Sequence, residues 1–96
     1  MGFTGTTVIA SVNQIKKAFG PAKFVDNTGM DKVNFDWRIK IGNDNFSIYD
    51  WKEYRPLNED EMIEWHIGVH MIDASKGDPN DRLEKSVNQI IEKIKN

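Results

Sequence analysis

The sequence contains no cysteine, no long apolar run and no excess of basic charge. The absence of cysteine excludes disulfides, thiol catalysis and zinc sites built on thiolates. No apolar segment approaches the roughly 20 residues of a membrane-spanning helix, so we expect no membrane partner. The 15 acidic residues outnumber the 13 lysines and arginines, which gives a formal net charge of −2. This balance argues against a broad phosphate-binding face, and therefore against nucleic acid as a partner.

Recognisable enzyme motifs are also missing. Neither of the glycine-rich phosphate loops, GxxxxGK[ST] and GxGxxG, occurs in the chain. His66 and His70 lie four apart in a strand-like segment, where such a spacing is about 13 Å and too long for one metal ion. Asp50 and His66 could approach each other across neighbouring strands, but no nucleophile in a recognisable context accompanies them. We therefore expect no catalytic activity, no metal site and no cofactor.

The composition is that of one globular domain over residues 1–96, with 39% hydrophobic and 29% charged residues. Residues 1–5 are predicted to form a flexible N-terminus. Beyond them, apolar and polar residues alternate in three segments, which is typical of half-buried strands. These segments are 33–41, 46–51 and 63–71. A β-branched run over residues 6–10 predicts a further short strand ahead of them.

Two segments carry helix signals. Ser11, followed three residues later by glutamine, forms a capping-box pattern, and Gly20 suits the end of that helix. A start near Thr7 stays open, because an earlier apolar residue fits the same helical face. Asp78 is a good N-cap with proline next to it, and apolar residues then recur on one face up to Ile94. The order β-α-β-β-β-α predicts an α+β fold, an antiparallel meander with two helices packed on one sheet face.

The two faces of the predicted sheet differ in character. One face is apolar and carries Trp37 and Trp65, which we assign to the core beneath the helices. The other face displays Tyr49, Trp51 and His66 among charged residues. Aromatic side chains on a polar face favour a partner or a ligand, on which a base could stack. The alternative is aromatic pairing between strands that only stabilises the sheet. A homodimer that packs these faces together would satisfy both interpretations.

Four short segments resemble small accessory proteins of tailed bacteriophages. The segments are Ala18–Pro21, Lys32–Trp37, Ile48–Lys52 and Trp65–Gly68. They follow the family's order: a helix ending in Phe-Gly-x-Pro, a Lys-Val…Trp strand, Ile-Tyr-Asp-Trp-Lys and Trp-His-Ile-Gly. The similarity covers residues 7–71, and the chain departs from it where the family has a second glycine after Trp-His-Ile-Gly. The resemblance implies a phage protein acting in the bacterial cytoplasm, and it implies no mechanism.

In that setting we expect a non-catalytic accessory protein that binds and inhibits or sequesters a host factor. Its partner would be a host protein, such as a defence factor, or a small anionic or nucleotide-like ligand, and the protein could be a homo-oligomer. The candidate ligand-binding residues combine aromatic rings, cations and hydrogen-bonding groups. They are Tyr49, Asp50, Trp51, Lys52, His66 and Arg38.

Two other interpretations remain open. The first is a protein–protein interaction or virion assembly module with no small-molecule ligand. In the second, the residues shared with the phage proteins form only a structural corner, in which Asp50 accepts hydrogen bonds from the ring N–H groups of tryptophan or histidine.

Overall fold

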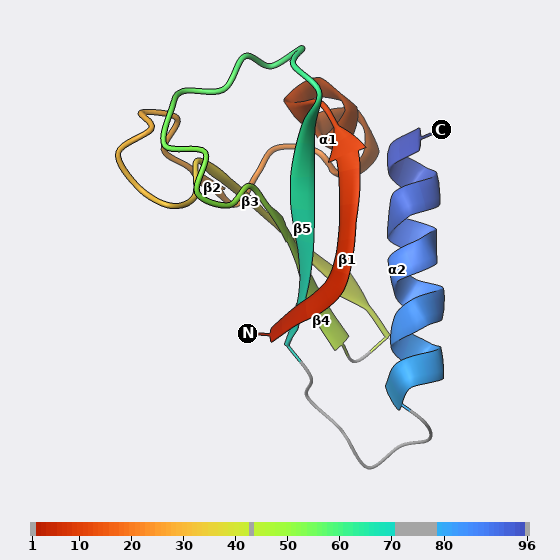
Figure 1. Ribbon diagram of the computed structural model, residues 1–96. Coiled ribbons are helices and arrows are strands. Elements are labelled where there is room, and N and C mark those ends of the chain that lie inside the picture. Colours follow the sequence, from red (N-terminus) through yellow and green to blue (C-terminus); the bar gives the residue numbers. More distant parts are fainter. Residues whose placement is uncertain (1, 43, 71–78, 96) are drawn as a thin grey trace.

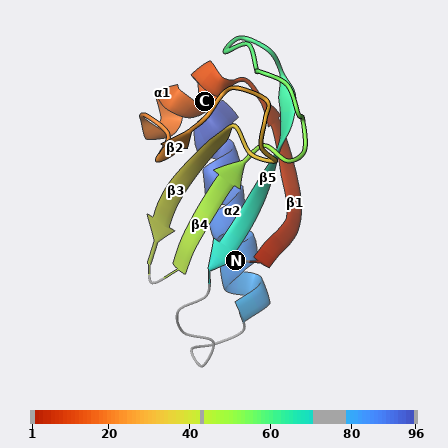
Figure 2. The ribbon, with the colours of Figure 1, turned by 90° about the vertical axis from the view of Figure 1, so that its left-hand side faces the viewer.

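The computed structural model describes residues 2–42, 44–70 and 79–95, which form a five-stranded antiparallel sheet and two helices (Figure 1). In chain order the elements are β1 (Gly2–Ala10), α1 (Val12–Phe19), β2 (Phe24–Val25), β3 (Phe35–Ile41), β4 (Asp44–Tyr49), β5 (Ile63–His70) and α2 (Pro79–Lys95). Both helices lie on the same side of the sheet, and the other side is left open (Figures 1 and 2). The predicted α+β class and the packing of both helices on one face are confirmed.

The strand order in the sheet is β1-β5-β4-β3-β2, and every neighbouring pair is antiparallel. The predicted meander is therefore present as β3, β4 and β5. The first of its strands begins at Phe35, two residues later than the predicted start at residue 33. The sequence did not predict β2, which has only two residues. This strand exists because Phe24 and Val25 pair with Asp36 and Phe35 of β3, which is a tertiary contact rather than a local preference.

The first strand is longer than the sequence predicts. Residues 2–5, expected as a flexible N-terminus, belong to β1 and pair with β5 through a β-bulge. At the bulge, Gly5 adopts a φ of 86°, which glycine tolerates without steric cost. The Thr4 hydroxyl donates to the carbonyl of Ile67 at 2.7 Å and accepts from the amide of Thr6 at 3.2 Å. A side chain thereby closes the gap that the bulge opens in the ladder.

The first helix has the predicted boundaries. The Ser11 hydroxyl accepts from the Gln14 amide, and the Gln14 side chain accepts from the Ser11 amide, so the capping box is complete. Gly20 closes the helix with a φ of 82°. The alternative start near Thr7 is wrong, since that residue lies in β1. The second helix begins at the predicted proline, and its expected cap Asp78 lies outside the described residues. Neither helix, as far as the structure describes it, has the length and apolar content needed to cross a membrane.

Two tryptophans form the centre of the core between the sheet and the helices. Trp37 and Trp65 are 2% and 0% exposed, and their rings meet edge to face with centroids 5.5 Å apart. Each indole N–H donates to a backbone carbonyl at 2.8 Å, that of Gly20 for Trp37 and that of Ala10 for Trp65. Burial of such rings is stabilising when their polar tips are satisfied. The predicted core assignment of both residues is confirmed.

Candidate ligand site on the open sheet face

The strand register places a row of side chains on the open face of the sheet, across all five strands. The strand register places its members opposite one another: Phe24, Asp36, Tyr49, His66 and Thr7. Side chains directly opposite each other on one face of a sheet lie within contact distance. The row therefore brings an acid, a phenol and an imidazole together at the end of β4, where the chain leaves the sheet.

We call Tyr49, Trp51 and His66 the aromatic corner. The Tyr49 ring lies 5.6 Å from the His66 ring, centroid to centroid, and 6.1 Å from the Trp51 ring, which it meets nearly at right angles. Tyr49 and His66 are half-buried, whereas Trp51 is 42% exposed. The sequence predicted Trp51 within a strand over residues 46–51, but β4 ends at Tyr49, so Trp51 lies beyond the strand and packs beside Tyr49. The pairing of Tyr49 and His66 fits a structural role, whereas part of Trp51 lies at the surface, where a ligand could contact it.

Two lysines converge on the indole ring of Trp51. The Nζ atoms of Lys32 and Lys52 lie 5.8 and 5.5 Å from the ring centroid, within the range of cation–π attraction. The Lys52 amide also donates to the Lys32 carbonyl at 2.8 Å, so a backbone hydrogen bond fixes the two residues to each other. Two like charges beside one ring repel each other and together favour an anion.

The backbone at Lys52 is strained. Its φ is 57°, in the left-handed region that costs a non-glycine residue about 1–2 kcal/mol. Such conformations persist where the surrounding structure imposes them, and they cluster at binding and catalytic sites. Here the strain accompanies the turn that places Lys52 beside Trp51.

A depression of about 280 Å³ opens next to Trp51 and is lined by Val33, Asp36, Tyr49 and Trp51. One Asp36 oxygen, Oδ2, accepts from the Arg38 guanidinium at 3.0 and 3.2 Å. The other, Oδ1, is buried and has no hydrogen-bond partner among the described residues. A shielded acceptor left without a donor is costly, so this oxygen favours an N–H or O–H donor from outside.

The phenol of Tyr49 is held in its protonated form. Burial raises the pKa of Tyr49, and the nearby carboxylate of Asp36 raises it further. Both effects make the negatively charged phenolate less favourable. Burial removes it from water, and the Asp36 carboxylate repels it. At neutral pH the hydroxyl of Tyr49 is therefore a hydrogen-bond donor.

Asp50 has a different position from the rest of the predicted set. It is 0% exposed, and its Oδ1 accepts from the amides of Asn34 and Phe35 at 2.8 Å each. Its Oδ2 accepts from the Asn34 side-chain amide at 3.0 Å. A structural corner thus exists, with amides of Asn34 and Phe35 as donors to Asp50, whereas the ring N–H groups of Trp37 and Trp65 donate to the Gly20 and Ala10 carbonyls.

Asn34 extends this corner into the loops around the depression. Its Nδ2 donates to the Arg55 carbonyl at 2.9 Å, and its Oδ1 accepts from the Gly29 amide at 3.1 Å. Asn27 adds a reciprocal pair with the backbone of Leu57, at 2.6 and 2.9 Å. These bonds tie the loop before β3 to the loop after β4, and so they fix the segments that carry the two lysines and Trp51.

The structure thus brings most of the predicted site residues together. Tyr49, Trp51, Lys52 and His66 form or flank the aromatic corner, and Arg38 reaches it through Asp36. Asp50 lies behind the site as a buried support. Lys32, Val33 and Asp36 also belong to the site, although they were not among the predicted residues. Only the alternation of β3 could have indicated Asp36, and nothing local indicates that Lys32 meets Trp51.

No protein-family model, curated protein or solved structure matches this chain. Over the described residues, no three histidine, aspartate or glutamate side chains gather as metal ligands would.

Proposed function

We propose that this protein is a non-catalytic binding protein that holds a small anionic ligand with an aromatic ring, such as a nucleotide. The observation that carries the proposal is the exposed ring of Trp51 with the ammonium groups of Lys32 and Lys52 within 6 Å of its centroid. Stacking of a base on such a ring contributes about 1–3 kcal/mol. The lysines supply the charge that a phosphate requires.

The depression beside Trp51 gives the ligand an orientation. Phosphate oxygens belong on the side of the lysines, and the base belongs over the ring, with one edge toward Asp36. An N–H group on that edge would donate to the Asp36 oxygen that has no partner among the described residues, after a small rotation of the carboxylate. The Tyr49 hydroxyl would donate to a carbonyl or ring nitrogen of the base. A volume of about 280 Å³ suits one base rather than a strand of nucleic acid.

The biological setting of this proposal comes from the resemblance to phage accessory proteins. A small phage protein that binds a nucleotide tightly and does not turn it over would act by sequestration in the bacterial cytoplasm. The host factor would then be a nucleotide signal rather than a protein.

Tryptophan fluorescence and calorimetry with a panel of mononucleotides, cyclic nucleotides and dinucleotides test the proposal. Trp51 is the exposed one of the three tryptophans, because Trp37 and Trp65 are 2% and 0% exposed, so a change in emission reports on the corner. We expect Trp51→Ala to abolish the response. Lys52→Gln should weaken binding by up to about fivefold, the scale of one exposed ion pair.

The matched control is Lys40→Gln. Lys40 is an exposed lysine on the open face of the sheet. It lies opposite Asn45, at the end of β3 away from Trp51. Its replacement changes the net charge equally and should leave affinity unchanged. If no member of the panel binds, or if Lys40→Gln and Lys52→Gln weaken binding equally, the ligand proposal is wrong.

A protein partner on the same face is the second candidate. Two large apolar side chains on this face are exposed: Phe24 at 43%, which lies opposite Asp36, and Trp51 at 42%. Exposed apolar side chains in one area favour a protein interface. A stoichiometric host protein that is lost with Trp51→Ala, together with no response to nucleotides, would support this candidate. Copies of the protein in purified virions would instead indicate an assembly role.

A further inference from the structure

The outer edge of β1 lacks the usual protection against pairing with another strand. The strand is nine residues long, GFTGTTVIA, and contains no charged residue and no proline. It forms one border of the sheet, and among the described residues no helix or strand lies beyond it (Figure 2). The opposite border, β2, has only two residues. Long edge strands without charges, prolines or cover are templates for a further strand, and here only the bulge near Gly5 interrupts the edge.

The hydrogen bonds at the bulge show which backbone groups point outward. The Thr4 hydroxyl joins the Thr6 amide to the Ile67 carbonyl of β5, so the Thr6 amide faces β5. Backbone groups alternate along a strand, which turns the amides and carbonyls of Thr7 and Ile9 away from β5. Ile9 is also 61% exposed. The stretch Thr6–Ala10 therefore presents both outward backbone groups and an apolar side chain.

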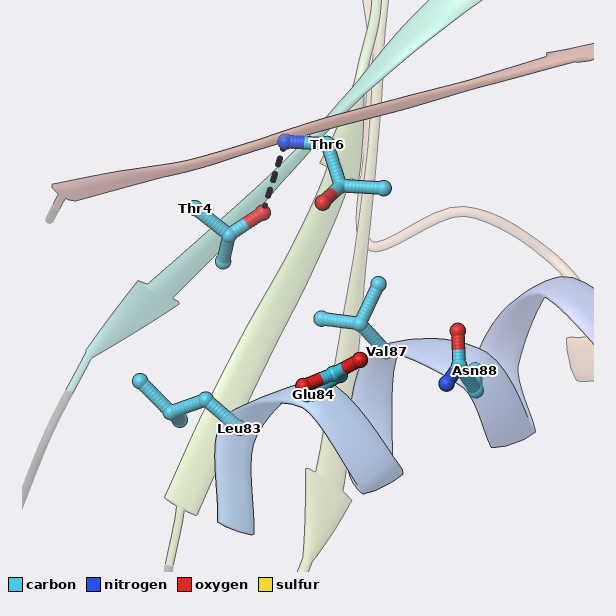
Figure 3. A pocket seen from close by; sticks show the side chains of 6 residues that line it. All are labelled: Thr4, Thr6, Leu83, Glu84, Val87 and Asn88. Carbon is cyan, nitrogen blue, oxygen red and sulfur yellow. Dashed lines mark hydrogen bonds between the residues drawn. The ribbon is translucent and has the colours of Figure 1, made fainter. Parts of the chain in front are cut away.

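A groove continues this edge on the helix side of the sheet (Figure 3). It has a volume of about 340 Å³ and lies between β1 and the first half of α2. The lining residues are Thr4, Thr6, Leu83, Glu84, Val87 and Asn88. Val87 is buried and Leu83 half-buried, so they provide an apolar floor, whereas Glu84 and Asn88 are exposed at the rim. Glu84 is the charged member of this lining.

We propose that β1 and α2 together bind an extended segment of a partner protein, which adds to the sheet as a sixth strand. Its backbone pairs with Thr7 and Ile9, and one of its apolar side chains enters the groove over Leu83 and Val87. A lysine or arginine of the segment meets Glu84. This mode combines affinity from main-chain hydrogen bonds with specificity from a side-chain groove.

Charge decides between a partner segment and a second copy of this chain. The β1 strand of another copy contains no lysine, arginine or histidine, so the paired strand itself would bring no cation to Glu84. A partner segment with a basic residue can pair with the backbone of β1 and also place a cation beside Glu84. The groove lies on the helix side of the sheet and the aromatic corner on the open side, so this inference is independent of the proposed nucleotide site.

The probes for the test are synthetic nine-residue peptides of alternating valine and threonine, with one lysine placed at each position in turn. A matched set carries glutamate in place of lysine. We expect the best lysine peptide to bind about tenfold more tightly than its glutamate partner, since one exposed charge contact is exchanged for a repulsion. Bound peptide should slow hydrogen exchange at the amides of Thr7 and Ile9 in NMR spectra.

Glu84→Lys should reverse the preference and favour the glutamate peptide. Ile9→Pro should abolish binding, because it removes an outward donor, and circular dichroism checks that the fold is retained. Trp51→Ala should change neither result, which separates this site from the nucleotide site. The inference is overturned if no peptide binds or if Glu84→Lys leaves the preference unchanged. It is also overturned if the protein is a dimer in sedimentation experiments that Ile9→Pro makes monomeric.

Discussion

Replacement of Asp50 by asparagine is the sharpest test of how the candidate site is supported. The asparagine keeps the shape of the side chain and one acceptor oxygen, which can still serve the amides of Asn34 and Phe35. Its new NH₂ group faces the Nδ2 of Asn34, so a donor meets a donor in place of a 3.0 Å hydrogen bond. Asn34 cannot relieve this by turning over, because its two polar atoms are already bound to Gly29 and Arg55.

The cost of Asp50→Asn follows from burial. Asp50 and Asn34 are both 0% exposed, so neither donor can turn to solvent. One buried donor left unsatisfied costs about 1–3 kcal/mol, and two hydrogen bonds to a charged acceptor become weaker neutral ones. The lower desolvation cost of a neutral amide offsets part of this loss. We expect a net destabilisation of about 2–3 kcal/mol, a large fraction of the roughly 5–14 kcal/mol typical of a domain this size.

Urea denaturation followed by the fluorescence of the buried tryptophans measures this change. Asp50→Asn should lower the midpoint with an unchanged slope, and the melting temperature should fall by roughly 10–20 °C. Asp31→Asn is the matched control, because Asp31 is exposed and its carboxylate binds only a neighbouring amide among the described contacts. If Asp50→Asn unfolds within about 0.5 kcal/mol of Asp31→Asn, the corner does not stabilise the fold as we argue.

Two further predictions concern the same region. Gly29 has a φ of 78°, and a Cβ there would lie 2.6 Å from the Cα of Arg55, so Gly29→Ala should destabilise by more than about 2 kcal/mol. Gly42→Ala has a similar positive φ but open space around it, and should cost only about 1 kcal/mol; equal losses in urea denaturation would refute the close approach. The raised pKa of Tyr49 should fall in Asp36→Asn, as measured by tyrosinate absorbance in a background where the other tyrosine is phenylalanine. The folded-state pKa of Tyr49 exceeds the unfolded one, so the stability linked to it is complete below a pH of about 10 and is lost as the pH rises through the folded value. An unchanged titration of Tyr49 in Asp36→Asn would exclude the contribution of Asp36.

The local part of the architecture is contained in the sequence. Alternation predicted β3, β4 and β5, and the same period separated Trp37 and Trp65 from Tyr49 and His66. The capping box at Ser11 set the start of α1. These features depend on residues within a few positions of one another, so a single chain is enough to recognise them.

The tertiary structure decided what no local pattern encodes. The short β2 exists only through its pairing with β3, and Lys32 reaches Trp51 only because the Lys52 amide binds the Lys32 carbonyl. The groove between β1 and α2 joins residues about eighty positions apart. Pairings of this kind depend on the register between distant strands and on loops held by buried amides. The sequence by itself therefore determined the faces of the sheet, and only the fold decided which side chains meet on them.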